Sequence, residues 1–72
     1  MNYIEFFEKE VPAWMRASNQ KMQEVGFATD AYWQWCVQSM AEISMKYNND
    51  RLVLNQFSII FEWLEEKANG TV

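Results

Sequence analysis

The sequence predicts an all-α protein, a compact three-helix bundle whose first helix is bent or split at Pro12, so that four helical segments form. Apolar residues recur at three- and four-residue spacing, no segment alternates as a strand would, and turn signals at Gly26 and residues 48–50 divide the chain. The 72 residues allow one domain, residues 1–72. The expected helices cover about residues 3–10, 12–25, 30–47 and 51–68.

The first two segments are separated by Pro12. Asn2 and Glu5 form a capping pair that begins the first helix. The apolar stripe then keeps its spacing across the proline, through Ile4, Phe7, Val11, Met15, Ser18, Met22 and Val25. Because proline removes the hydrogen bond to Glu8, either the first helix ends near Glu10 or one helix kinks. The continuous phase of the stripe favours nearly collinear segments.

The third helix follows a left-handed cap at Gly26 and begins at Thr29 or Asp30. Its expected core face consists of Tyr32, Trp33, Cys36, Val37, Met40, Ile43 and Tyr47. Trp35 falls on the opposite, polar face. It is therefore either an anchor for a protein partner or a side chain lying over the bundle edge, shielded by Phe27 or a side-chain stem.

The last helix, capped by Asp50 and ended by Asn69 and Gly70, is the element around which we expect the fold to be organised. Its apolar residues form two groups. The broad group contains Val53, Leu54, Phe57, Ile60, Phe61 and Leu64, and a second ridge contains Leu52, Ile59 and Trp63, with Gln56 and Lys67 between the groups. Either the first two helices cover this ridge, which places the last helix at the centre, or another chain does.

These patterns select candidate partner-binding residues, which either lie off the core face of their helix or form the second ridge. They are Trp35, Met45, Phe6, Leu52, Ile59 and Trp63. Several exposed apolar side chains near one another would mark an interaction surface.

Catalytic and metal chemistry are not expected. The chain has no histidine, and Cys36 is its only cysteine, which excludes a disulfide and a Cys/His zinc site. The glutamates at 5, 8, 62, 65 and 66 have helical-neighbour spacing but lie on polar faces, as a solvated acidic surface does. No phosphate-binding loop or nucleophile–base set occurs. We therefore expect no enzyme, cofactor or metal.

The net charge of −4 and the pI of about 4.6 argue against direct binding of nucleic acid or an anionic membrane. The N-terminal residues lack the basic region of a signal peptide, and no apolar run reaches membrane-spanning length. One unpaired cysteine suggests the cytoplasm. An alternative function for an acidic chain is mimicry of nucleic acid in the basic groove of a DNA- or RNA-handling protein.

The stretch YWQWCVQSMAEISMKYNND gives the chain a resemblance in general character to small, acidic, Met- and Trp-rich helical proteins encoded by phages and prophages of Gram-positive bacteria. That resemblance implies a binder or inhibitor of a host protein, or a phage assembly factor or chaperone. Together with the residues, it leads us to expect a non-enzymatic protein–protein interaction module that forms a homodimer.

Overall fold

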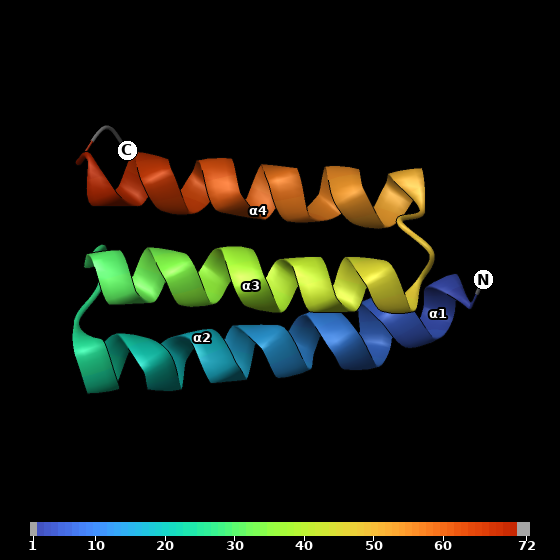
Figure 1. Cartoon of the computed structure of the whole chain (residues 1–72), viewed down its shortest axis with the longest axis horizontal. Coiled ribbons are helices and arrows are strands. Elements are labelled where there is room, and N and C mark those ends of the chain that lie inside the picture. The colour runs from blue at the N-terminus through green and yellow to red at the C-terminus, as the bar shows by residue number, and fades with distance from the viewer. Residues whose placement is uncertain (1, 71–72) are drawn as a thin grey trace.

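The computed structural model describes residues 2–70 and shows three antiparallel helices, the first made of joined pieces (Figure 1). The elements are α1 (Tyr3–Glu5), the π-helical turn η1 (Phe6–Glu10), α2 (Val11–Val25), α3 (Asp30–Lys46) and α4 (Arg51–Ala68). Residues 2–70 contain no strand. The predicted three-helix bundle with a bent first helix is confirmed, and the helix bounds agree with the expected ones to within about a residue.

Side-chain caps begin each helix where the sequence places them. Asn2 Oδ1 accepts a hydrogen bond from the Glu5 backbone N–H at 3.0 Å. Thr29, rather than Asp30, caps α3, because its Oγ1 accepts from the Tyr32 N–H at 3.2 Å. Asp50 caps α4 in the same way. Each such cap satisfies a backbone donor that the first helical turn leaves free.

The bend of the first helix is a π-helical turn that lies just before Pro12. The Val11 N–H donates to the Phe6 carbonyl, five residues back instead of four. Pro12 follows in the first turn of α2, where its missing N–H is tolerated. Figure 1 shows the α1 end tilted away from the axis of α2. The first helix is thus one bent helix: its winding changes just before Pro12, but its pieces remain joined.

The wide turn changes which side chains of the first helix reach the core. A π turn holds one residue more than an α turn, so the residues before it are rotated by about one position. Phe6 is fully buried, whereas Ile4 and Phe7, both assigned to the apolar stripe from the sequence, are exposed. After the turn, Trp14 rather than Met15 is buried. The predicted stripe was therefore wrong at Ile4, Phe7 and Met15, whereas Val11, Ser18, Met22 and Val25 lie in or against the core as predicted.

The core lies between the three helices, and α3 runs between α2 and α4 in the view of Figure 1. The buried hydrophobic residues are Phe6, Trp14, Tyr32, Cys36, Met40, Val53, Phe57, Ile60 and Leu64. The rings of Trp33 on α3 and Phe61 on α4 meet at 5.4 Å, and those of Trp35 and Trp14 join α3 to α2 at 5.3 Å. The alternative that placed the last helix at the centre of the bundle was wrong.

Candidate functional site

α4 presents the two apolar groups that the sequence separates, and only the first enters the core. Val53, Phe57, Ile60 and Leu64 are buried. In contrast, the second ridge is exposed: Leu52 retains 43%, Ile59 61% and Trp63 49% of its accessible surface. The first two helices therefore leave this ridge uncovered.

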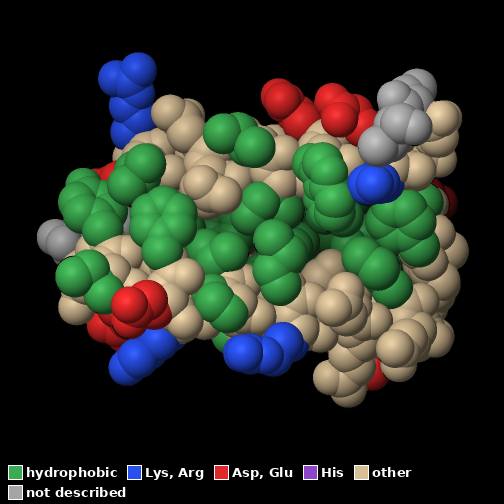
Figure 2. Space-filling view, turned by 180° about the vertical axis from the view of Figure 1, so that it is seen from behind, with side chains coloured by type: hydrophobic (Ala, Val, Ile, Leu, Met, Phe, Trp, Pro, Cys, Tyr) green, Lys and Arg blue, Asp and Glu red, His purple; other side chains and the backbone are tan. Residues whose placement is uncertain are grey.

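The exposed ridge is part of a longer apolar surface on the face away from α3. Figure 2 shows hydrophobic side chains running along this face from the N-terminal end to the C-terminal end. Trp63 borders a hollow of about 370 Å³ together with Met15 and Phe27, and Leu52 borders another hollow beside Tyr3. We call this surface the back-face band, and it comprises Tyr3, Met15, Phe27, Leu52, Ile59 and Trp63.

Charges of both signs lie at the ends of the back-face band. Asp50 and Arg51 line the hollow beside Leu52. At the opposite end, the Lys67 ammonium lies 5.3 Å from the centre of the Trp63 ring, within the range of a cation–π interaction. A surface that carries an apolar centre and both signs at its ends has the elements needed to pair with a copy of itself.

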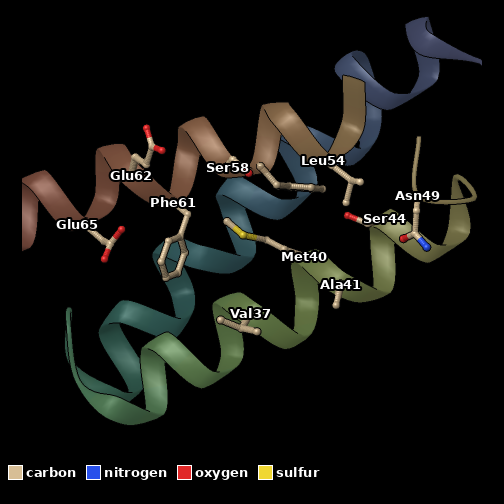
Figure 3. Close-up of a pocket in the computed structure, with 11 residues that line it drawn as sticks. Val37, Met40, Ala41, Ser44, Asn49, Leu54, Ser58, Phe61, Glu62 and Glu65 are labelled. Carbon is tan, nitrogen blue, oxygen red and sulfur yellow. The ribbon is translucent and has the colours of Figure 1, made fainter. Parts of the chain in front are cut away.

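A second hollow, the α3/α4 groove, lies between those two helices and measures about 500 Å³ (Figure 3). Its lining residues are Val37, Met40, Ala41, Ser44, Asn49, Leu54, Phe57, Ser58, Phe61, Glu62 and Glu65. Val37, expected in the core, keeps 57% of its surface and lines this hollow instead. Leu54 on the facing helix is exposed as well.

The charged residues that line the groove are both acidic. Figure 3 shows Glu62 and Glu65 along α4 at one end and Asn49 and Ser44 at the other. Within residues 2–70, neither Glu62 nor Glu65 forms an ion pair. The groove thus joins an apolar floor to a negatively charged rim at one end.

Two of the predicted partner-binding residues are placed elsewhere. Phe6 is wrong as a surface residue, since the π turn rotates it into the core, where its ring meets Phe57 at 5.7 Å. Trp35 is partly buried on the core, stacked at 25° on Trp14, which agrees with the alternative of a shielded side chain and not with an exposed partner anchor. The cover comes from Trp14, which the sequence alternatives did not name.

Met45 does lie off the core, with 67% of its surface exposed, but it belongs to neither the back-face band nor the groove. Sequence reasoning missed the groove because it assigned Val37 and Leu54 to buried faces. One signal was present: Ala41 and Ser44 are small residues on a helix otherwise rich in large ones, and small side chains leave space between helices.

Two titratable side chains of the described residues, Cys36 and Tyr32, are buried. Cys36 is buried, and desolvation raises the pKa of its thiol. Burial likewise raises the pKa of Tyr32 to about 12, and its hydroxyl pairs with Ser18 at 2.7 Å. Residues 2–70 contain no group of His, Cys, Asp or Glu side chains arranged to hold a metal ion. In that same part of the chain, each helix is too short or too polar to cross a bilayer.

Comparisons with protein-family models, curated proteins and solved structures find no match. The resemblance to phage-encoded proteins stays a prediction. The back-face band and the α3/α4 groove are therefore the features from which a function is argued.

Proposed function

We propose that the chain is a small, non-enzymatic protein–protein interaction module that forms a homodimer through the back-face band and acts by binding another protein. The observation that carries the proposal is the exposed ridge of Leu52, Ile59 and Trp63, which no helix covers within residues 2–70. The roles implied by the phage-protein resemblance, binding or inhibiting a host protein, belong to this class.

Burying the ridge in an interface would stabilise a chain of this size. Burial of a large apolar side chain contributes about 1.5–3 kcal/mol, and a small domain has a correspondingly small core. Domains in this size range often gain stability from oligomerisation when they lack disulfides and metals. With a single free cysteine, this chain has no internal disulfide.

A two-fold axis between Ser58 and Ile59 gives the back-face band a self-complementary arrangement. In an antiparallel pair of α4 helices, residues equally distant from the axis lie opposite each other. Lys67 lies eight residues beyond Ile59, and Asp50 lies eight residues before Ser58, so both are equally distant from that axis. The Lys67 ammonium of one copy would then approach the Asp50 carboxylate of the other, at both ends of an interface whose apolar centre is Ile59.

Ile59→Arg tests the dimer, because the substitution places two like charges beside each other at the axis. We expect sedimentation velocity over a concentration series to show a concentration-dependent dimer for the wild-type chain and a monomer for Ile59→Arg. Met45→Arg is the matched control, because it makes the same change at an equally exposed apolar position outside the back-face band. A wild-type chain that stays monomeric at high micromolar concentration would refute the dimer.

A further inference from the structure

We propose that the α3/α4 groove docks an amphipathic helix of another protein, whose apolar stripe carries lysine or arginine residues on its edge. This inference rests on the proposed function, in which the chain acts by binding another protein. It adds a site distinct from the back-face band and the chemistry of the partner.

The apolar lining of the groove fits side chains from one face of a helix. Val37 on α3 and Leu54 on α4 stand at its two sides, and Met40 and Phe57 form its floor. Figure 3 shows these two helices flanking the hollow along its length, so an occupant helix would complete a four-helix arrangement. Helices dock in such grooves through apolar residues at positions i, i+3, i+4 and i+7. The flexible Met40 side chain adapts to different anchors.

The negative charge on the rim of the groove indicates that the partner segment is basic. Glu62 and Glu65 border the groove, and no basic residue lines it. A docked apolar segment without cations would partly desolvate both carboxylates with no compensating partner, which is unfavourable. Lysine or arginine on the edge of the segment would compensate that cost. Because Asn49 and Ser44 are neutral, the basic end of the occupant should lie at the Glu62 and Glu65 end.

A second copy of the chain is a poor occupant of this groove. The chain has ten acidic and six basic residues. Among the basic residues, Lys21 pairs with Glu24 at 3.8 Å and Lys46 with Glu10 at 2.6 Å. Lys67 covers Trp63. The groove therefore matches a basic partner, whereas the back-face band, with both signs at its ends, matches another copy.

Two designed helical peptides provide the probes. Both carry leucine at positions i, i+3, i+4 and i+7, and one has lysine and the other glutamate at the flanking positions. We expect the lysine peptide, labelled with fluorescein, to bind the wild-type chain in fluorescence anisotropy and the glutamate peptide to bind at least about tenfold more weakly. Failure of the lysine peptide to bind, or equal binding of both peptides, would overturn the proposal.

Variants of the chain locate the site. Glu62→Gln combined with Glu65→Gln should weaken binding of the lysine peptide about three- to tenfold, as expected for two partly exposed ion pairs. Glu8→Gln combined with Glu42→Gln removes the same charge from exposed positions outside the groove and should leave the affinity unchanged. An equal loss in both double variants would show attraction by net charge alone and reject the groove.

Val37→Arg places a cation and a longer side chain in the groove at an exposed position, so the helical circular dichroism should persist while peptide binding is lost. Ile59→Arg should retain peptide binding even if it dissociates the dimer. Peptide binding that survives Val37→Arg but is lost in Ile59→Arg would assign the peptide to the back-face band instead. Sedimentation velocity tests the dimer separately from peptide binding. A failure of the dimer proposal can therefore be distinguished from a failure of the groove proposal.

Discussion

A buried pair of hydroxyl groups joins α2 to α3. Ser18 Oγ and the Tyr32 hydroxyl lie 2.7 Å apart, and both residues are buried. A polar group inside a small core is tolerated only when it is hydrogen-bonded, and every described buried side-chain polar atom here has a partner. The hydrogen bond therefore sets the register of α2 against α3, in addition to the apolar contacts around it.

Ser18→Ala should lower the free energy of unfolding by about 1–3 kcal/mol, because the Tyr32 hydroxyl loses its partner while staying buried. Urea denaturation followed by circular dichroism measures the change. Adding Tyr32→Phe removes the orphaned hydroxyl, and the double variant should recover part of the loss. If the losses of free energy in the two single variants add up to the loss in the double variant, the two hydroxyl groups make no stabilising interaction with each other.

Tyr32 also makes stability depend on alkaline pH. Burial raises its pKa from 10.0 to about 12 in the folded chain. The unfolded chain therefore releases this proton first, so the stabilisation is complete below pH 10 and is lost as pH rises through about 12. We expect the free energy of unfolding to fall by up to about 1.4 kcal/mol per pH unit in this window. Tyr32→Phe should show a shallower decrease, and equal slopes would contradict the assignment.

The sequence predicted individual residues best where the governing interaction is local. The caps at Asn2 and Asp50 were predicted because a capping side chain acts within a few residues of its own position. The positions of Phe6 and Trp35 were not. Phe6 depends on how a neighbouring turn is wound, and Trp35 on a ring, Trp14, that arrives from another helix.

At the scale of one element, α4 carries core residues on one side and an exposed apolar ridge on the other. Phe57→Ala should cost about 3–5 kcal/mol, as expected for a large residue removed from a core. Ile59→Ala, two residues away and exposed, should change monomer stability by less than about 0.5 kcal/mol. Urea denaturation at low protein concentration, where any dimer dissociates, compares the two. A large loss in Ile59→Ala would show that Ile59 stabilises the monomer.

The extents of the helices could be predicted, but the winding of the first helix could not. Gly26 and Asp50 fix the ends of their elements through their own backbone and side-chain preferences. Pro12 indicates that a hydrogen bond is missing nearby. It does not indicate whether the chain responds by a break, a kink or a wide turn, because these differ only in which carbonyl the preceding N–H groups reach.

In the molecule as a whole, the sequence predicted three antiparallel helices but not the middle one. α3 has large side chains on two sides, with Trp35 toward α2 and Trp33 toward α4. α4 has an equally wide apolar arc, and the sequence alone does not say which helix leaves part of its arc exposed. The sequence separated the ridge of Leu52, Ile59 and Trp63 from the core group but left open whether the first two helices cover it. The groove arises from two helices together, and its one signal in the sequence is the pair of small residues Ala41 and Ser44.

Dimer formation would couple the stability of the whole molecule to its concentration. A partner that binds only the folded state raises the apparent stability by mass action. We expect the thermal midpoint of the wild-type chain to rise with protein concentration and that of Ile59→Arg to stay constant. Differential scanning calorimetry at several concentrations measures both. A wild-type midpoint that is independent of concentration would argue against self-association.

The π turn at Phe6–Glu10 has a consequence for the length of the chain. One residue more than an α-helix needs is accommodated there, so removing one residue should convert the turn to an α turn without rotating Phe6 out of the core. We expect deletion of the exposed Lys9 to preserve helical circular dichroism and most of the stability. Deletion of Lys21 inside the regular α2 should instead rotate one end of that helix by about 100° and unfold the bundle. We therefore expect the first helix to tolerate a one-residue deletion at the π turn, where its winding already departs from the α-helical repeat.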